Sequence, residues 1–399
     1  MKEGFFTKKE TESISRPDGK TYSCLSCGLA KSAKHPRMKP SGGFAKGILN
    51  IGISPNEQDD ITGEPFTGKK GRFLKQQLGK FGIDLHEDCL NINAVNCYCQ
   101  KPTPYQIACC RKTILKLIQE KKPELVLLHG EIPTQSVIGH RWKQDFGNIH
   151  KWRGWAIPDE EFKTWLCPML DIEVVMNADD QYLTIWKQDL VNALEKSNLG
   201  LPKYKKPEIE IISDLRVLNN IDKGLVAFDY ETTGIKPHLP IQEIICTSVS
   251  ASQNHSFVFM MPKDPTELRP FRKILRNLNI GKIAQNMKFE HTWSQVKLGI
   301  EVNHWVWDTM QATHISDNRP GISGLKFQVY VQFGVIDYSS EITPYLHADG
   351  SNRINRIKEL IQTDEGKNKL LTYCGFDSIY EHRLALLQMD SINYDFLPF

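Results

Sequence analysis

The sequence predicts an α/β protein of two domains. Its 399 residues are more than a single hydrophobic core usually organises, so two domains of ordinary size are expected. Both halves alternate short apolar runs with amphipathic segments, which is typical of strands and helices that follow one another. Between the halves, residues 199–207 combine prolines with basic residues and lack apolar periodicity, as a linker does. We therefore expect domains at 21–198 and 208–399, joined by this linker and preceded by a flexible segment at 1–20.

The expected strands are short apolar runs, and the expected helices repeat apolar residues every three or four positions. In the first half, strands are expected at 47–53, 90–95 and 124–128, and helices at 72–81, 104–119 and 180–194. In the second half, strands are expected at 224–230, 243–249 and 256–260, and helices at 266–276, 287–296, 308–314 and 364–388.

The composition is 40% hydrophobic and 24% charged, which excludes a disordered or fibrous chain. No apolar run approaches the roughly 18 residues that a membrane span needs. The polar start also lacks the apolar stretch of a signal peptide. We therefore expect a cytoplasmic protein with no membrane partner.

The two halves differ in charge and in cysteine content. Residues 1–206 contain 31 Lys and Arg against 24 Asp and Glu, whereas the remainder contains 19 against 23. A basic first half fits a polyanion partner, and an acidic second half suits metal ions. Eight of the ten cysteines lie in the first half. In an intracellular chain, such clustering indicates metal binding before disulfides.

One cysteine pair, Cys24 and Cys27, has the Cys-x-x-Cys spacing of half a zinc or iron–sulfur site. The other half must come from two later pairs, Cys97/Cys99 and Cys109/Cys110. This separation is long for a small zinc finger and fits a cluster attached to a preformed domain. Ordinary buried thiols are the alternative.

A set of carboxylates is spread along the second half. Asp229 and Glu231 end an expected strand and share one of its faces, because strand side chains repeat every second residue. Adjacent carboxylates repel each other unless a cation separates them, and oxygen ligands suit Mg²⁺ or Mn²⁺. Glu290 falls in the first turn of a helix that follows a short strand. Tyr373 and Asp377, four residues apart, share one helical face.

These motifs, at 226–234, 281–290 and 370–377, resemble the proofreading 3′–5′ exonuclease domains of family A DNA polymerases over about residues 207–399. Those domains belong to the tyrosine branch of the DEDD superfamily. The resemblance implies a ribonuclease-H-like fold and two-metal hydrolysis of terminal phosphodiesters. It implies that Asp229 bridges both metals while Glu231 and Asp377 complete the first site.

The same resemblance assigns the remaining positions of the site. Tyr373 is expected to orient the attacking water, and Thr232 and Asn286 to contact the terminal nucleotide. Glu290 departs from the family, which usually has aspartate there, so we expect altered metal preference or rate rather than loss of activity. Asp308 also matches the family and is interpreted as a helix cap.

The first half resembles the uracil-DNA glycosylases that carry a 4Fe–4S cluster, over about residues 20–195. The matching stretches are 62–71, 93–97 and 106–110. The resemblance implies that Phe66 stacks on an extruded base and that Asn93 reads the edge of that base. It favours Cys97 over Cys99 and Cys110 over Cys109, so the implied cluster ligands are Cys24, Cys27, Cys97 and Cys110, with zinc as the alternative metal.

Two catalytic positions of that family are not retained. Ile53 stands where the family has a polar residue, and Cys167 stands where it has a histidine. We therefore expect a degenerate, DNA-binding glycosylase-like domain. Asp59 and Asp60 are the candidates for a replacement polar group.

Together the motifs predict a 3′–5′ exonuclease acting on single-stranded 3′ ends of DNA, with two Mg²⁺ or Mn²⁺ ions, in replication proofreading. A similar pairing of domains precedes the polymerase domain in phage-type DNA polymerases, which implies host cytoplasm and a polymerase subunit as the candidate partner. Only 22 residues follow Asp377, so no polymerase domain is expected here. The alternatives are a non-catalytic module that binds DNA and recruits a polymerase, and an active glycosylase–nuclease fusion for repair. An exoribonuclease branch shares the carboxylates, and the pairing favours DNA.

Overall fold

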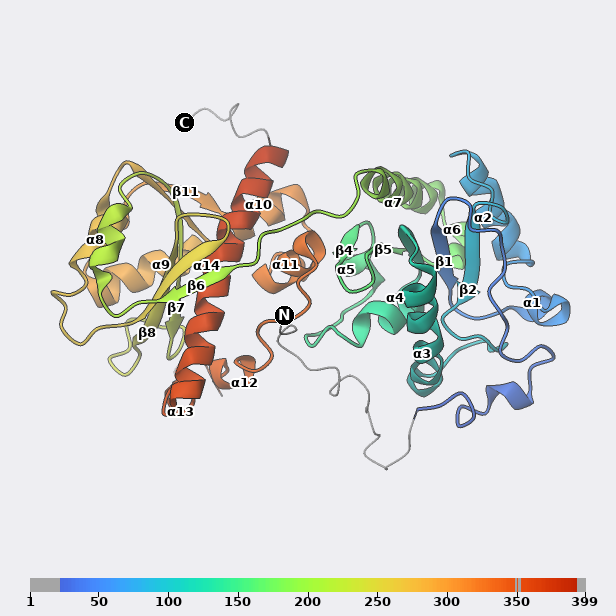
Figure 1. Cartoon of the computed structure of the whole chain (residues 1–399), viewed down its shortest axis with the longest axis horizontal. Coiled ribbons are helices and arrows are strands. Elements are labelled where there is room, and N and C mark those ends of the chain that lie inside the picture. The colour runs from blue at the N-terminus through green and yellow to red at the C-terminus, as the bar shows by residue number, and fades with distance from the viewer. Residues whose placement is uncertain (1–21, 349, 351–352, 393–399) are drawn as a thin grey trace. The chain divides into compact units, whose positions relative to one another are not determined.

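The chain divides between Pro202 and Lys203 into two compact units, each with its own sheet. The computed structural model describes residues 22–348, 350 and 353–392 (Figure 1). The segment 1–20, expected to be flexible, lies outside the described residues. We refer to the described residues up to Pro202 as the front unit and to those from Lys203 as the rear unit.

The front unit is built on a five-stranded sheet with the order β2-β1-β3-β5-β4. Its strands are β1 (Ile48–Gly52), β2 (Cys89–Asn93), β3 (Leu125–His129), β4 (Ile157–Asp159) and β5 (Thr164–Met169). All neighbouring strands are parallel except β4, which runs antiparallel to β5 at one edge. Every residue of β1, β2 and β3 is buried, as expected for parallel strands covered on both faces.

Helices and loops surround this sheet. The helices are α1 (Glu57–Thr62), α2 (Lys69–Gly79), α3 (Pro104–Lys121), α4 (Glu131–Thr134), α5 (Ile149–Trp152), α6 (Ile172–Asn177) and α7 (Asp180–Asn198), with 3₁₀ and π turns at Leu29–Lys31 and Gln135–Gly139. The start of α3 follows from its sequence, because Thr103 and Gln106 form a capping box around Pro104. The core beneath α2 and α7 includes Leu74 and Trp186, both fully buried.

The rear unit contains a six-stranded mixed sheet with the order β11-β10-β7-β8-β9-β6. Its strands are β6 (Glu208–Ile211), β7 (Gly224–Thr232), β8 (Ile244–Ser250), β9 (His255–Met260), β10 (Ile280–Ala284) and β11 (Trp305–Asp308). The central strands β7, β8 and β9 form an antiparallel meander. The outer strands β10, β11 and β6 join their neighbours in parallel.

The longest helix of the rear unit, α14 (Asp364–Ser391), packs across β7, β8 and β9. The other helices are α8 (Arg269–Arg276), α9 (Met287–Trp293), α10 (Thr309–Ser316), α11 (Leu325–Phe333), α12 (Thr343–Leu346) and α13 (Ile357–Leu360), with 3₁₀ and π turns at Leu215–Asn220 and Ser294–Leu298. Gly375 allows α14 to approach the sheet closely, because a Cβ there would lie 2.8 Å from side-chain atoms of Ile209 and Val258. This close approach brings the neighbouring residues of α14 to the strand that bears Asp229.

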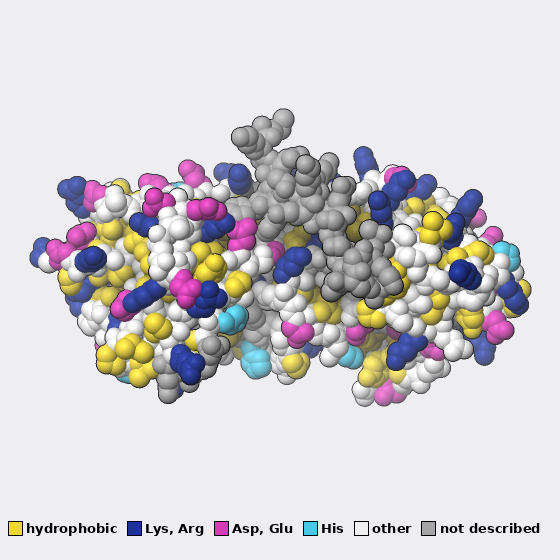
Figure 2. Space-filling view, turned by 90° about the horizontal axis from the view of Figure 1, so that it is seen from below, with side chains coloured by type: hydrophobic (Ala, Val, Ile, Leu, Met, Phe, Trp, Pro, Cys, Tyr) yellow, Lys and Arg dark blue, Asp and Glu magenta, His cyan; other side chains and the backbone are white. Residues whose placement is uncertain are grey.

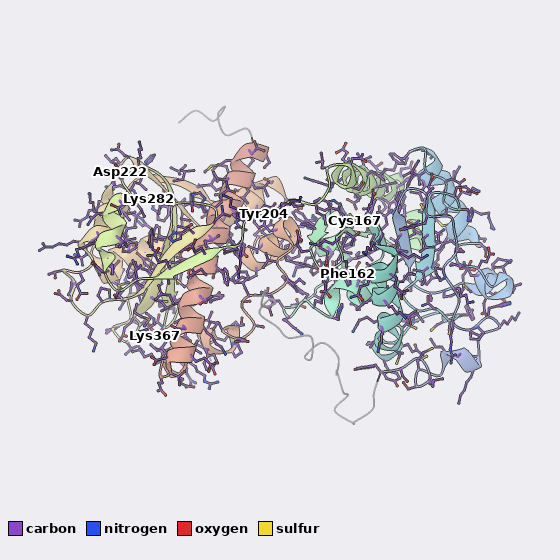
Figure 3. The ribbon with its side chains drawn as sticks, viewed as in Figure 1. Phe162, Cys167, Tyr204, Asp222, Lys282 and Lys367 are labelled. Atoms are coloured by element: carbon purple, nitrogen blue, oxygen red, sulfur yellow. The ribbon has the colours of Figure 1, made fainter. Side chains whose placement is uncertain are left out.

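The predicted two-domain α/β class is confirmed. The predicted helix at 287–296 is α-helical only to Trp293 and continues as a π turn. The sequence analysis did not identify β5, which carries Cys167, because Pro168 lies within it. Figure 3 shows Cys167 on this strand, where its side chain is buried.

None of the helices among the described residues is both long and apolar enough to cross a membrane. On the face shown in Figure 2, Lys and Arg side chains are interspersed with Asp and Glu side chains. Positive and negative side chains are therefore mixed on this face, despite the difference in net charge between the two halves of the sequence.

Candidate functional site

Strand β7 places two carboxylates on one face of the rear sheet, as the alternation predicts. Asp229 pairs across the sheet with Ser248, and Glu231 pairs with Cys246. The pairing register shifts directly after Glu231. At this point the hydroxyl of Thr232 donates to the carbonyl oxygen of Gly234 at 2.6 Å, so the end of the strand is fixed by its own side chain.

Helix α14 brings Tyr373 and Asp377 to the same region. Asp377 is buried, accepts a hydrogen bond of 2.7 Å from the hydroxyl of Tyr338, and forms an ion pair with Lys326 of α11. The ammonium nitrogen of Lys326 also lies 4.4 Å from the ring centroid of Tyr373. A single lysine thus offsets the charge of Asp377 and contacts the aromatic ring of the site.

The fourth predicted carboxylate, Glu290, lies in the first turn of α9 and is 2% exposed. Its helix starts at Asn286, whose φ of 66° is left-handed. Asp308 holds this turn by accepting from the backbone N–H groups of Asn286 (3.1 Å) and Met287 (2.9 Å). Asp308 also caps α10, which confirms its interpretation as a helix cap.

The electrostatics of these carboxylates favour a cation. Removal from water and the negative charge of Asp377 raise the pKa of Asp229 from 3.8 to about 7. Removal from water and the charge of Asp229 also raise the pKa values of Glu231 and Glu290 well above their ordinary values. One oxygen of Glu290, Oε2, is buried without a hydrogen-bond partner among the described residues. Hard oxygen donors in this state fit Mg²⁺ or Mn²⁺.

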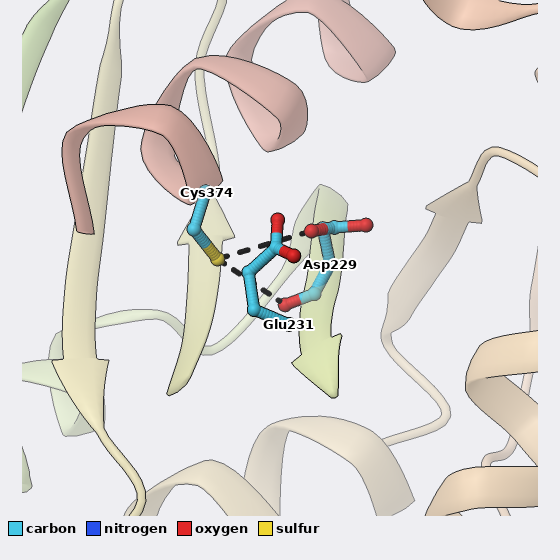
Figure 4. Close-up of side chains that lie close together, drawn as sticks. All are labelled: Asp229, Glu231 and Cys374. Atoms are coloured by element: carbon cyan, nitrogen blue, oxygen red, sulfur yellow. Dashed lines mark hydrogen bonds between the residues drawn. The ribbon is translucent and has the colours of Figure 1, made fainter. Parts of the chain in front are cut away.

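Cys374 is a member of this site that the sequence analysis missed (Figure 4). Its thiol donates to the backbone carbonyl oxygen and to Oδ2 of Asp229, both at 3.8 Å. Potential ligand atoms of Cys374, Asp229 and Glu231 lie within 4.8 Å of one another. The cysteine directly follows Tyr373 in the sequence, whereas no spacing in the sequence indicates Lys326 or Tyr338.

In the front unit, Phe66 and Asn93 line a pocket beside the end of β1. A Cβ at Gly52 would lie 2.5 Å from Oδ1 of Asn93 and 2.9 Å from Cζ of Phe66, so only glycine allows this arrangement. Phe66 itself has a left-handed φ of 64°. The structure therefore brings the two expected base-binding residues together.

Ile53, His129 and Asp171 line the same pocket. A Cβ at Gly130 would lie 3.2 Å from Cβ of Asp171 and 3.6 Å from Cδ1 of Ile53, so the carboxylate-bearing residue lies close to the isoleucine. Burial raises the pKa of Asp171. The sequence analysis missed Asp171 because it follows β5, the strand that was not predicted.

The two residues proposed as replacement polar groups, Asp59 and Asp60, have other partners. Asp59 Oδ1 accepts from the N–H groups of Thr67 (2.7 Å) and Gly68 (3.2 Å) and from the Thr67 hydroxyl, while Oδ2 accepts from the backbone of Asn56. Asp60 accepts from the N–H groups of Lys34 and His35, both at 2.9 Å. Asp60 organises a loop and does not line the pocket, so we correct that suggestion for Asp60. Asp59 holds the turn at Thr67 and Gly68 and also lines the pocket that contains Ile53.

The four cysteines of the expected cluster lie close enough for Cys24 and Cys27 to affect the pKa values of Cys97 and Cys110. Burial, and to a smaller extent the proximity of Cys27, Cys97 and Cys24, raises the pKa of Cys110 to about 11. The N–H of Arg37 donates to the sulfur of Cys97 at 3.2 Å. A set of four thiols is a soft donor set that fits iron–sulfur or zinc.

The two alternative cysteines have other contacts. Cys99 donates toward the side-chain oxygen of Gln106 at 3.9 Å, and the sulfur of Cys109 lies 3.8 Å from the hydroxyl of Ser26.

Comparison with known proteins agrees with this division. Residues 41–187 match the uracil DNA glycosylase superfamily, and residues 209–356 match a 3′–5′ exonuclease family. Two regions that match known families therefore follow one another. The expected order of a glycosylase-like domain and a ribonuclease-H-like exonuclease domain is thereby confirmed.

Several curated relatives of the front unit are type-4 uracil-DNA glycosylases. The protein from Archaeoglobus fulgidus is 26% identical over 136 residues, which are 33% of this chain and 66% of the relative. The one from Saccharolobus solfataricus is 28% identical over 146 residues, 36% of this chain and 63% of the relative. The one from Thermotoga maritima is 34% identical over 86 residues, 21% of this chain and 44% of the relative. The chain thus spans less than two thirds of the length of these relatives.

Some solved structures with low sequence identity and low TM-score to this chain are nucleases. Brucella melitensis NrnC with bound Mg²⁺ is 18% identical, with a TM-score of 0.35, over 48% of this chain and 82% of that chain. Escherichia coli RNase D is 16% identical, with a TM-score of 0.33, over 48% of this chain and 46% of that chain.

Proposed function

We propose that this chain is a divalent-metal-dependent 3′–5′ exonuclease that hydrolyses terminal phosphodiesters of single-stranded DNA in replication proofreading. The observation that carries the proposal is the convergence of four carboxylates from three separate elements, Asp229 and Glu231 of β7, Glu290 of α9 and Asp377 of α14. Three of these carboxylates are buried and Asp229 is half-buried, and like charges so close together persist where a cation offsets them. A non-catalytic module would not need them.

In this proposal the four carboxylates hold the divalent ions. When bound, such ions lower the pKa of a water molecule and stabilise charge on phosphate oxygens. Burial and the charge of Asp377 raise the pKa of Tyr373, so its hydroxyl keeps its proton and can orient a water molecule. We assign Thr232, the last residue of β7, and Asn286, which directly precedes α9, to contact the terminal nucleotide.

The test compares a single-stranded DNA labelled at its 3′ end with the same strand labelled at its 5′ end. We expect Mg²⁺ to release the 3′ label first, as a mononucleotide, and EDTA to prevent this release. Asp229→Ala is expected to reduce the rate about a thousandfold or more, which corresponds to roughly 4 kcal/mol. Digestion that begins at the 5′ end, or a folded Asp229→Ala variant with the wild-type rate, would contradict the proposal. Faster digestion of an RNA strand would reassign the substrate.

For the front unit we propose DNA binding with an iron–sulfur cluster on Cys24, Cys27, Cys97 and Cys110. Anaerobically purified protein is expected to absorb near roughly 400 nm and to lose this band on Cys24→Ser. Cys109→Ser is the matched control that should keep the band. Colourless protein with one zinc ion per chain would favour zinc.

The pocket lined by Phe66 and Asn93 favours base binding without cleavage, because Ile53, which also lines it, replaces a polar group of the resembled family. Cys167, which stands where that family has a histidine, lies in the hydrophobic core and is not among the residues that line the pocket. A second candidate function, uracil excision, is favoured by one observation, the position of Asp171 beside Ile53. Uracil-containing DNA should be assayed with the Asp229→Ala variant, which removes nuclease activity. Binding without abasic sites supports our proposal. Abasic sites that disappear on Asp171→Asn establish the second function.

A further inference from the structure

A fifth carboxylate, Glu381, lies one helical turn beyond Asp377 on α14. Its side chain is 1% exposed, and neither Oε1 nor Oε2 has a hydrogen-bond partner among the described residues. Asp377, by contrast, is bonded to Tyr338 and paired with Lys326. Glu381 is therefore the buried acid of α14 whose charge the structure leaves without a donor.

The surroundings of Glu381 are the other acids of the site. Burial raises its pKa, and the charges of Asp229, Glu290 and Asp377 raise it further. Asp229 and Glu290 have the largest effects among these neighbours, and Glu290 carries an unpartnered buried oxygen of its own. Glu381 of α14 and Glu290 of α9 are thus two buried acids near Asp229; among the described residues, the first has no donor and the second has one oxygen without a donor.

An ionised carboxylate that is buried without a donor lowers the stability of the folded state by several kcal/mol, unless a cation binds it or a proton neutralises it. The usual structural compensation is absent for Glu381 within the described part of the chain, where its oxygens accept no N–H or O–H. A divalent cation supplies that compensation and prefers several oxygen ligands.

We propose that Glu381 is an additional metal ligand, which acts with Asp229 and Glu290 to hold the ion on the α9 side of the site. This inference rests on the proposed exonuclease function. It also gives a role to the longer side chain of Glu290, since the ion is then shared between two glutamates that reach from different helices.

The experiment is a calorimetric titration of the full chain with Mg²⁺ in the absence of DNA. Mg²⁺ is the suitable probe because it prefers oxygen ligands, so the thiols of the front unit do not compete for it. Glu381→Gln is expected to weaken Mg²⁺ binding about tenfold or more, whereas Glu365→Gln, an exposed position on the same helix, should leave it unchanged.

A thermal readout complements the titration. In EDTA, Glu381→Gln is expected to raise the melting temperature of the rear unit, because it removes a buried carboxyl group that must either carry an unpaired charge or take up a proton. Saturating Mg²⁺ should then stabilise the wild type more than this variant. A buried acid with a purely structural role would not produce this reversal.

The outcomes separate the two proposals. Equal Mg²⁺ affinity in the wild type and folded Glu381→Gln overturns the role of Glu381, while the exonuclease proposal stands if Asp229→Ala still loses Mg²⁺ binding and digestion. Retained Mg²⁺ binding and digestion in Asp229→Ala overturn the exonuclease site itself. If Glu381→Gln fails to fold, Glu381→Asp keeps the charge on a shorter side chain, and unchanged Mg²⁺ affinity in that variant also overturns the role.

Discussion

The buried acids of the two units differ in what surrounds them. In the front unit, Asp59 is 3% exposed and accepts hydrogen bonds through both of its oxygens. In the rear unit, Glu290 and Glu381 are buried to a similar extent, yet within the described part of the chain Glu381 has no donor and Glu290 has an oxygen without one. Burial alone therefore does not mark a functional acid. A buried carboxylate whose oxygens accept hydrogen bonds from backbone N–H groups organises a loop. A buried carboxylate without donors can bind a cation instead.

The largest expected effect tests the structural half of this comparison. Asp59→Ala leaves the N–H groups of Thr67, Gly68 and Asn56 without their acceptor, and each lost bond of this kind costs about 1–3 kcal/mol. We expect the front unit to lose about 3–5 kcal/mol of unfolding free energy. Urea denaturation followed by tryptophan fluorescence measures it. Asp59→Asn, which keeps an acceptor oxygen, is the control. If Asp59→Ala lowers the unfolding free energy by less than about 1 kcal/mol, Asp59 does not organise this loop and the contrast with the rear unit fails.

A smaller effect concerns the pH dependence of the metal-free rear unit. The pKa of Asp229 is about 7 when folded and near 3.8 when unfolded, so the folded state holds the proton more tightly. Its contribution to stability is therefore complete below about pH 4 and is lost as the pH rises through about 7. Thermal melts in EDTA should show the rear unit becoming less stable across this range.

Asp229→Asn should make this pH profile shallower, because one of the acids with a raised pKa no longer titrates. Saturating Mg²⁺ should also flatten it in the wild type, because the ion competes with the proton. A profile in EDTA that is the same for Asp229→Asn and the wild type would show that Asp229 is not the titrating group.

The smallest effect is expected for Tyr373→Phe. Its hydroxyl is assigned to orient a water molecule, a contribution that is smaller than that of the carboxylates. We expect the rate of 3′ digestion to fall about three- to tenfold, or roughly 1 kcal/mol, with Mg²⁺ binding unchanged. A thousandfold loss at unchanged Mg²⁺ affinity would place the hydroxyl in the chemistry instead.

Much of the fold followed from local patterns. Continuous apolar runs indicated β1, β2 and β3, and the Thr103–Gln106 capping box fixed the start of α3. Strand β5 was missed because Pro168 contradicts strand propensity, although its parallel pairing with β3 overrides that preference. Because β5 was not predicted, Asp171, which follows it, was not identified as a candidate site residue either.

By itself, the sequence determined which residues could share a site, because alternation along β7 and the four-residue spacing on α14 are local geometry. It placed Asp229 with Glu231 and Tyr373 with Asp377. Only the tertiary structure decided which acids are satisfied. Hydrogen-bond donors come from segments distant in sequence, as Tyr338 and Lys326 do for Asp377. Packing likewise leaves Glu381 without a donor among the residues that the structure describes. The sequence specifies which positions are acids, whereas the free energy of each charged carboxylate depends on the groups that folding brings near it.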